Sequence, residues 1–290
     1  YEALVWRRHR ARSERCIMTP DIDFDAITAI IAEIAAEEVK AKLGVLSRAE
    51  VTEKSAGDFV TSADLAVERR LGAALQDLTP DAQIVGEEAV SEGRASIAGL
   101  ADDHLSWVID PIDGTGNFAA GYPLSAVILA LVRKDEVLAG WIHDPYSDRT
   151  FVGSLGGGAW FGGRRLSVHT PSEGRLMNGS IYGRMFRRST GFQATWARGR
   201  GKMGGIFNAR CVGHEHMSRL AGLSHFGGYS KLFPWDHAAG FLMHSEAGGV
   251  GKLISGEPYK PSNADIPGLL APDEDIWNKI HDIITTPEAV

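Results

Sequence analysis

Cysteine is scarce in this chain of 290 residues. Its two cysteines, Cys16 and Cys211, stand far apart in the sequence. Neither belongs to a closely spaced pair of the kind that binds zinc, and two cysteines are too few for the disulfide framework of a small secreted domain. Because this usage is typical of a reducing compartment, we expect a cytoplasmic location.

Positive charge and long apolar runs are lacking as well. The 30 Lys and Arg residues are outnumbered by 37 Asp and Glu, which leaves a net charge of -7. A general nucleic-acid binder needs a basic field that releases counterions from phosphates, so we expect no nucleic-acid partner, although a local site for an anionic metabolite stays compatible. The longest apolar stretch, residues 118–132, is interrupted by Gly121 and Pro123. It is too short to span a bilayer, which predicts a buried strand and no membrane partner.

The first fifteen residues differ from the rest, because they carry five arginines without apolar periodicity: Arg7, Arg8, Arg10, Arg12 and Arg15. Arginine-rich composition is typical of some targeting peptides, but this segment has no clear apolar face or cleavage signal. We interpret residues 1–17 as an upstream extension, with Met18 as the more natural start, and keep a targeting peptide as the alternative.

The remainder has an ordinary globular composition, 44% hydrophobic and 23% charged. Sequence patterns predict helices over residues 20–43, 64–78, 216–223, 236–247 and 273–284. They predict strands over residues 84–85, 105–109, 125–133, 137–143, 150–153, 180–182 and 225–229, and another that ends near 212. Because helices and strands mix throughout, we predict an α/β fold with two packed lobes, residues 18–171 and 172–290.

The first two helices allow more detailed predictions. We expect Thr19 to cap the first helix, with Pro20 in its first position. In the second helix, the residues expected to face inward are Leu65, Leu71, Leu75 and Leu78.

An apolar strand that ends on an acid carries the main chemical signal. Residues 105–109 lead into Asp110, and Asp113 follows three positions later. Between them, Pro111 lacks an N–H group and is expected to end the strand and turn both carboxylates toward one point. Neighbouring carboxylates repel each other unless a cation lies between them, and an all-oxygen set selects a hard cation such as Mg²⁺. The glycines of residues 114–116 leave N–H groups for an anion, so the motif indicates a phosphatase, with a plain surface turn as the alternative.

Three further acids lie where a strand ends or a helix begins. Glu87 follows the strand at 84–85, Asp236 heads a predicted helix, and Asp64 lies three residues after Thr61. Each has an ordinary explanation, because Asp236 can cap its helix and Thr61 with Asp64 fits a capping box. Taken one at a time, these acids indicate structure rather than function.

Taken together, the motifs resemble the inositol monophosphatase family of metal-dependent sugar phosphatases. The matching pieces, in family order, are Lys54-Ser-x-x-Asp58-x-Val-Thr61-x-x-Asp64, Gly86-Glu87-Glu88, Asp110-Pro-Ile-Asp113-Gly-Thr115, and Trp235-Asp236 with Glu246-Ala-Gly-Gly249. The resemblance implies a sugar-phosphatase fold of alternating helix and sheet layers. It also implies a homodimer and Mg²⁺-dependent hydrolysis of a small phosphorylated metabolite.

The resemblance further implies roles for individual residues. The implied catalytic residues are Asp64, Glu87 and Thr115, with Thr115 paired with Asp64 to orient the attacking water. The implied ligands of two or three Mg²⁺ ions are Glu87, Asp110, the carbonyl of Ile112, Asp113 and Asp236. The implied substrate contacts are Asp113, Gly114, Thr115, Gly213, His214, Glu215 and Tyr229.

The segment expected to contact the alcohol part of the substrate departs from the family pattern. Where members typically have Ser-x-Gly-Ser/Thr-Ala, this chain has Cys211-Val-Gly213-His214-Glu215. Tyr229 replaces an acid that contacts inositol hydroxyls in well-known members. We therefore expect an intact metal site with altered specificity, and histidinol phosphate, fructose bisphosphate and nucleoside bisphosphates are alternative substrates. The sequence of residues 116–118, Gly-Asn-Phe, is more similar to the inositol branch of the family than to the Gly-Thr-Lys variants of the histidinol-phosphate and bisphosphate-nucleotide branches.

Two other motifs have more than one interpretation. His214 and His216 are separated by one residue on a predicted helix, so they point to different faces and indicate a substrate contact or a packed histidine rather than a zinc site. Residues 184–202 are basic and contain no acid. We interpret this stretch as a solvated loop, with an arginine that reaches a substrate anion as the alternative. It is also the only support for a regulatory RNA- or protein-binding role on a phosphatase scaffold.

Overall fold

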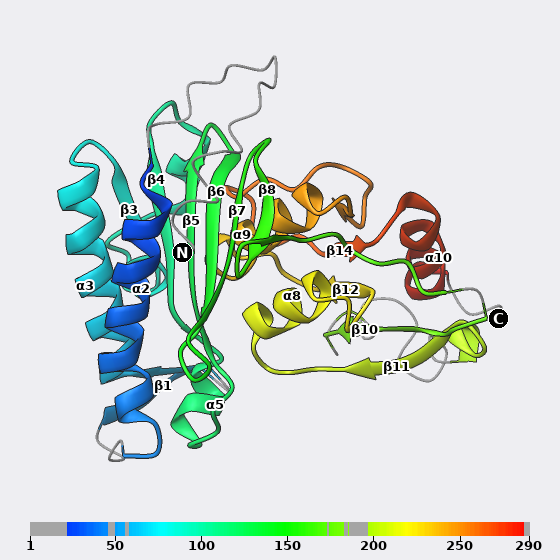
Figure 1. The fold of residues 1–290 in the computed structure, drawn as a ribbon, viewed down its shortest axis with the longest axis horizontal. Helices are drawn as coiled ribbons and strands as arrows, with labels where there is room; N and C mark the ends of the chain where they lie inside the picture. The colour runs from blue at the N-terminus through cyan, green and yellow to red at the C-terminus, as the bar shows by residue number, and fades with distance from the viewer. Residues whose placement is uncertain are drawn as a thin grey trace.

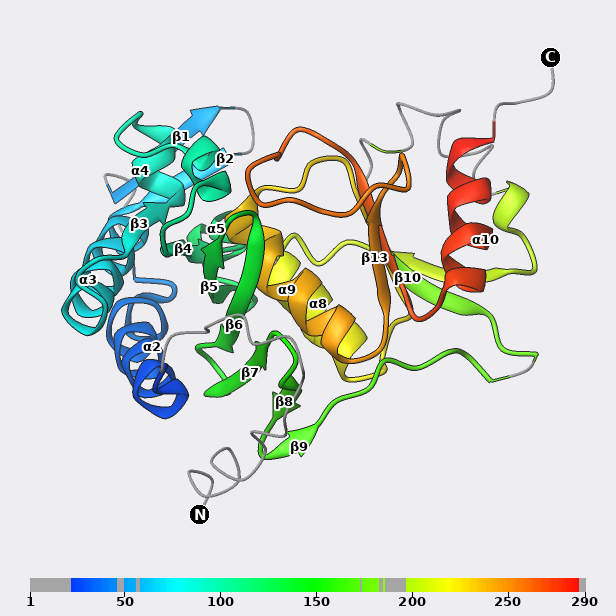
Figure 2. The same cartoon turned by 90° about the horizontal axis from the view of Figure 1, so that it is seen from above.

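The computed structural model describes residues 22–45, 50–55, 58–172, 174–182, 185 and 197–286. The layers follow one another in the order helix, sheet, helix, sheet, helix, as Figures 1 and 2 show. Their helices are α2 (Phe24–Glu38) and α3 (Ser62–Leu78) on the outside, α8 (Val212–Leu220) and α9 (Pro234–Glu246) in the middle, and α10 (Glu274–Thr285) at the far side. This arrangement confirms the predicted fold of alternating helix and sheet layers.

The first sheet has seven strands in the order in which they occur along the chain. They are β3 (Gln83–Gly86), β4 (Ser106–Asp113), β5 (Ala126–Arg133), β6 (Glu136–Asp144), β7 (Arg149–Ser154), β8 (Gly158–Phe161) and β9 (Arg164–Arg165). Only the β3–β4 pair is parallel. Parallel pairing brings the C-terminal ends of β3 and β4 to the same edge of the sheet, which is where the predicted acids lie.

Side-chain alternation along β4 decides which way its acid points. Trp107 and Ile109 pack into the core against α2 and α3, whereas Val108 packs into the core shared with α9. Successive side chains of a strand point to opposite faces, so Asp110 lies on the same side as Val108. The β4 carboxylate therefore points toward α9, the helix that carries Asp236.

The second sheet has the strand order β11-β10-β12-β14-β13. Its strands are β10 (Met177–Ile181), β11 (Met203–Phe207), β12 (Phe226–Tyr229), β13 (Val250–Leu253) and β14 (Gly268–Ala271). One face packs against α10 through Trp277 and Ile280, and the other meets α8 and α9 through Tyr229 and Leu270. The lobe boundary near residue 171 falls between the two sheets and stays a prediction, because α9 also packs on the first sheet.

Short elements that the sequence patterns did not predict surround the edge of the first sheet. They are the hairpin of β1 (Val51–Ser55) and β2 (Asp58–Thr61), the helices α4 (Glu87–Ser91) and α5 (Thr115–Ala119), and the 3-10 turns η1 (Lys40–Lys42) and η3 (Ile97–Ala101). Stretches of five residues or fewer carry too little periodicity to be recognised. Two of them nevertheless carry predicted site residues, because Glu87 begins α4 and Thr115 begins α5.

The first two helices differ in part from expectation. Asp23 caps α2 by accepting a hydrogen bond from the N–H of Ala26 at 3.1 Å, while Thr19 and Pro20 lie outside the described residues. The capping box at the start of α3 is present. Leu65 and Leu78 were wrongly expected to face inward, because both lie on the solvent side of α3, 44% and 46% exposed.

Two strand predictions were also wrong. Pro111 does not end β4, which continues to Asp113 through a register shift, and a bulge tolerates the missing N–H group of proline. The segment near Val212 is not the end of a strand, since β11 ends at Phe207 and Val212 begins α8, which ends at Leu220. Among the described residues, no helix combines the length and the apolar character needed to cross a membrane.

Candidate active site

Three aspartates from different parts of the chain meet between the first sheet and α9. Asp110 and Asp113 come from the end of β4, and Asp236 is the third residue of α9. Each offers a carboxylate oxygen within 4.8 Å of the others. Asp110 and Asp113 are buried, whereas Asp236 is partly exposed. Chain folding thus gathers acids more than a hundred residues apart into one cluster.

The cluster is electrostatically unfavourable without a cation. Burial, followed by repulsion from Glu87, raises the pKa of Asp110 well above its ordinary value. Burial also raises the pKa of Asp113. Among the residues that the structure describes, no group donates a hydrogen bond to either oxygen of Asp110, although buried carboxylates normally accept one. The contact of Asp110 with the Asp236 carboxylate raises its pKa further. An all-oxygen set of this kind fits a hard divalent cation such as Mg²⁺.

Asp113 is held by the start of α8. Its carboxylate accepts hydrogen bonds from the N–H groups of Val212 at 3.0 Å and Gly213 at 2.5 Å. The thiol of Cys211 donates to it at 3.0 Å. A Cβ atom on Gly213 would lie 2.8 Å from the Cβ of Ala126, so glycine is required for this close approach. The predicted substrate residue Gly213 therefore positions a carboxylate of the cluster.

Glu87 lies beside the aspartates because β3 and β4 pair in parallel. Gly86 is opposite Ile109, which brings the residues that follow them, Glu87 and Asp110, to the same edge. Burial and repulsion from Asp236 raise the pKa of Glu87 well above its ordinary value. Lys54 of the hairpin partly offsets this charge, with its Nζ atom 3.4 Å from Glu87 Oε1 and 3.0 Å from Glu88 Oε1.

Thr115 and Asp64 are in contact, as the resemblance implied. Gly114, the residue before α5, adopts a left-handed conformation with φ of 86°, and the Thr115 hydroxyl points back toward the sheet. This hydroxyl lies 2.8 Å from the carbonyl oxygen of Ile112 and 3.2 Å from Asp64 Oδ1. Asp64 also accepts hydrogen bonds from the N–H and hydroxyl groups of Thr61. Burial raises the pKa of Asp64 to about 7, so its protonation can change near neutral pH.

Glu215 and Tyr229, two predicted substrate contacts, are buried against each other. They are 0% and 1% exposed, and the Tyr229 hydroxyl donates to Glu215 Oε2 at 3.1 Å. The N–H of Ala209 donates to the other oxygen at 3.0 Å. Behind them, the buried Arg219 places its Nη2 atom 2.7 Å from His216 Nδ1. The structure therefore engages Glu215 and Tyr229 in an internal network rather than exposing them to a ligand.

His214 and His216 lie in different surroundings, as their helical spacing predicted. His214 is partly exposed, and its Nε2 atom lies 3.2 Å from the carbonyl oxygen of Ser125. His216 is buried beside Arg219. Most of the basic stretch 184–202 lies outside the described residues, but Arg198 donates to the carbonyl of Ile283 at 3.0 Å and so contacts α10.

We expect the protein to lose stability in acid, because two histidines are buried in a neutral form. Burial lowers the pKa of His237 and His244 from an ordinary 6.5 to about 3. The native state then binds fewer protons than the unfolded chain, so stability is present above pH 6.5 and declines as the pH falls toward 3. Replacing His237 by Phe should reduce the slope of unfolding free energy against pH in this window by up to about 1.4 kcal/mol per pH unit. Urea unfolding between pH 4 and 7 measures that slope.

The exposed His169 offers a matched control, because His169→Phe should leave the slope unchanged. The carboxylates with raised pKa act in the opposite direction, but they are common to all three proteins and cancel in the comparison. Equal slopes for wild type and His237→Phe would contradict the prediction.

Two residues that help to build the site were assigned no role in it from the sequence. Glu68 accepts hydrogen bonds from the N–H groups of Glu88 at 2.8 Å and Ala89 at 3.0 Å, and so caps α4 just after Glu87. Its signal is an acid one helical turn after Asp64, on the buried face of α3. Cys211 is the other, and its donation to Asp113 left no signal because a lone buried cysteine usually acts as a small apolar residue.

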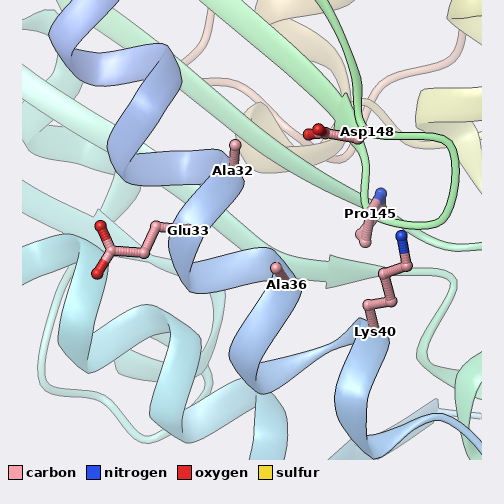
Figure 3. Close-up of a pocket in the computed structure, with 6 residues that line it drawn as sticks. All are labelled: Ala32, Glu33, Ala36, Lys40, Pro145 and Asp148. Atoms are coloured by element: carbon pink, nitrogen blue, oxygen red, sulfur yellow. The ribbon is translucent and has the colours of Figure 1, made fainter.

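A recess of about 290 Å³ lies elsewhere, between α2 and the turn after β6. Figure 3 shows its lining, in which Ala32 and Ala36 face Pro145 while the Glu33 carboxylate points away from it. It contains none of the clustered aspartates. The chemistry of the residues, rather than the size of this recess, therefore identifies the candidate site.

Comparison with known proteins supports the same interpretation. The profile described as the inositol monophosphatase family matches residues 21–284. A fructose-1,6-bisphosphatase/inositol-1-monophosphatase of Aquifex aeolicus is 31% identical, and the match covers 80% of this chain and 88% of that protein. The Nus factor SuhB of Pseudomonas aeruginosa is 35% identical, with 72% and 76% covered.

The fold matches solved structures as well. An inositol monophosphatase (IMPase) of Thermotoga maritima superposes with a TM-score of 0.73 at 24% identity, and the superposition covers 90% of this chain and 95% of that one. The profile match, the relatives above 30% identity and the layered fold lead to one conclusion: this chain belongs to the inositol monophosphatase family.

Proposed function

We propose that this protein is a Mg²⁺-dependent phosphomonoester hydrolase that acts on a small phosphorylated metabolite. The observation that carries the proposal is the buried cluster of Asp110, Asp113 and Asp236, in which no group among the described residues donates a hydrogen bond to Asp110. Unpartnered buried carboxylates are costly in a purely structural role, and a bound cation would offset that cost. Membership of a phosphatase family supports the same function.

Glu87, Asp110 and the Ile112 carbonyl would hold one Mg²⁺ ion, and Asp110, Asp113 and Asp236 a second. Bound Mg²⁺ would lower the pKa of water and neutralise charge on the phosphate oxygens. A third ion near Glu87 would compete with Lys54, whose ammonium group already lies there. The protein groups themselves supply a rigid frame of oxygens, because Asp113 is fixed by the backbone of α8.

Thr115 and Asp64 would orient the attacking water and move its proton. The Thr115 hydroxyl can accept a proton from water only if it passes its own proton on, and Asp64 Oδ1 lies 3.2 Å away to receive it. A pKa of about 7 for Asp64 suits this exchange at neutral pH. The N–H groups of Gly114 and Thr115 would hold the phosphate while the transfer occurs.

The substrate is best sought outside simple inositol phosphates. Tyr229 and Glu215 bond to each other, so neither is free to bind the hydroxyl groups of a polyol. The Aquifex aeolicus relative is named for both fructose bisphosphate and inositol phosphate hydrolysis, which keeps a bisphosphorylated sugar among the candidates. Histidinol phosphate and nucleoside bisphosphates remain alternatives. We also propose a cytoplasmic homodimer, as family membership implies.

Phosphate release from a panel of phosphomonoesters tests the proposal. The panel contains inositol phosphate, histidinol phosphate, fructose bisphosphate and a nucleoside bisphosphate, each with Mg²⁺ and with chelator. We expect turnover of at least one ester with Mg²⁺, and a loss of at least about 100-fold with chelator. A folded protein that binds Mg²⁺ but releases no phosphate from any ester would contradict the proposed enzyme.

A second candidate function is regulatory, because relatives from Pseudomonas aeruginosa and Neisseria meningitidis carry the name Nus factor SuhB or putative Nus factor SuhB. In this chain it would use an RNA or protein surface rather than the acid cluster. Binding to RNA with a steep salt dependence, together with no phosphatase activity, would favour it over the enzyme.

A further inference from the structure

An exposed arginine, Arg210, reaches over the turn that follows Asp113. Arg210 directly precedes the three residues that donate hydrogen bonds to the Asp113 carboxylate. Its Nη2 atom lies 3.3 Å from the point that a Cβ atom on Gly116 would occupy, and the ring of Phe59 lies 3.7 Å from the same point. A side chain at position 116 would push against the guanidinium, so glycine there leaves the space that Arg210 uses.

The backbone holds Arg210 in this position from several sides. Its φ of 53° lies in the left-handed region, which residues with side chains seldom adopt. Its N–H donates to Asn208 Oδ1 at 2.7 Å, and its carbonyl lies 3.3 Å from Asn117 Nδ2. Asn117 belongs to α5, the helix that begins with Thr115. The arginine is therefore tied to the same short helix as the proposed catalytic threonine.

The Arg210 guanidinium forms no ion pair with the acid cluster among the described residues. Within the described part of the chain, no carboxylate lies within ion-pair distance of its guanidinium, whereas Lys54 contacts both Glu87 and Glu88. If Arg210 could reach Asp110 or Asp113, those unfavourably buried carboxylates would attract it strongly. The guanidinium instead lies over Gly116, the residue that directly follows the proposed catalytic Thr115.

We propose that Arg210 binds a second anionic group of the substrate, a phosphate or carboxylate separate from the phosphate that is hydrolysed. The inference rests on the proposed phosphatase function and narrows its substrate class. A guanidinium presents parallel N–H donors that match two oxygens of such a group. The preferred substrates are then bisphosphorylated metabolites or phosphorylated carboxylic acids, rather than monophosphates of neutral polyols.

Steady-state kinetics on three esters test this assignment. Fructose bisphosphate carries a second phosphate, 3-phosphoglycerate carries a carboxylate, and glycerol 2-phosphate has a neutral alcohol part. In the wild type we expect higher kcat/KM for at least one of the first two. Arg210→Met should lower that kcat/KM roughly 10- to 100-fold, mainly through KM, and change glycerol 2-phosphate less than about 3-fold. Arg210→Lys should retain part of the preference.

Arg164→Met is the matched control, because Arg164 is also exposed but lies on β9 at the far edge of the first sheet. It should leave all three values unchanged. The ratio between two esters is measured on one preparation, so partial misfolding of a variant cancels. The inference is overturned if Arg210→Met leaves the ratio unchanged. An equal loss on all three esters with an altered oligomeric state in light scattering would also overturn it, because Arg210 would then serve subunit contact.

The two proposals fail in different ways. If the wild type hydrolyses none of the esters with Mg²⁺, the proposed enzyme function fails and Arg210 loses its role with it. If the wild type hydrolyses glycerol 2-phosphate as efficiently as fructose bisphosphate and 3-phosphoglycerate, the phosphatase function stands. Only the assignment of Arg210 to a second anionic group is then lost.

Discussion

Asp110→Asn should abolish phosphate release while leaving the metal-free protein at least as stable as wild type. Asp110 is shared between both proposed metal positions, so its loss should lower kcat/KM by at least about 10³-fold. The same change removes a buried charge to which no group among the described residues donates a hydrogen bond. We therefore expect the unfolding free energy without metal to stay constant or rise by about 1–3 kcal/mol. A residue with a purely structural role would show the opposite result.

Thermal unfolding with and without Mg²⁺ separates these effects. Mg²⁺ should raise the Tm of the wild type, because it binds the native state alone, and should raise the Tm of Asp110→Asn much less. The exposed Asp81 provides the control, since Asp81→Asn should preserve activity and the Mg²⁺ response. If Asp110→Asn kept its turnover, or responded to Mg²⁺ as the wild type does, the metal site would have to lie elsewhere.

Arg219→Met should lower the unfolding free energy of the protein by about 3 kcal/mol. This is the largest loss of stability that we expect from any of the substitutions proposed for this chain. Arg219 is 1% exposed and lies between α8 and the second sheet. It donates to His216 and lies over the Tyr229 ring at 5.6 Å. Burial raises the pKa of Glu215, and the positive charge of Arg219 opposes that rise. Removing it leaves Glu215 without its cation and His216 without its donor. Urea unfolding at neutral pH without metal measures the loss.

A second substitution, at Glu215, tests whether the lost charge compensation causes the destabilisation of Arg219→Met. Glu215→Gln removes the charge that Arg219 compensates, so the double variant should recover at least about 1 kcal/mol relative to the sum of the single changes. Arg70→Met is the control, because Arg70 forms partly exposed ion pairs with Glu37 and Glu38 and should cost less than about 1 kcal/mol. Equal losses for Arg70 and Arg219 would show that the buried network carries no special stability.

The candidate site shows where sequence patterns succeed. An apolar strand that leads into an acid is a local signal, and from it Glu87 could be placed directly after β3 and Asp110 after the apolar part of β4. The capping box of Thr61 and Asp64 is equally local, and the structure shows that the same carboxylate also meets Thr115. The ordinary and the functional explanation of Asp64 therefore hold together.

The substrate side shows where sequence patterns stop. Glu215 and Tyr229 looked like ligand contacts, but whether a polar residue faces a ligand or a neighbour depends on how helices pack. Leu65 was misplaced for the same reason, since an apolar residue at the edge of a helical stripe can face solvent. Short helices such as α4 and α5 were missed because a single turn has no period to detect.

The sequence by itself determined the family, the layered fold and the order of the acidic motifs, because these depend on residue types and short spacings within each motif. Only the tertiary structure decided that Asp113 is fixed by α8, that Glu215 and Tyr229 close on each other, and that Arg210 reaches over Gly116. The first and third of those contacts join segments far apart along the chain, and the second joins α8 to a strand of the second sheet. Their formation depends on packing between layers, which no local pattern of residues encodes.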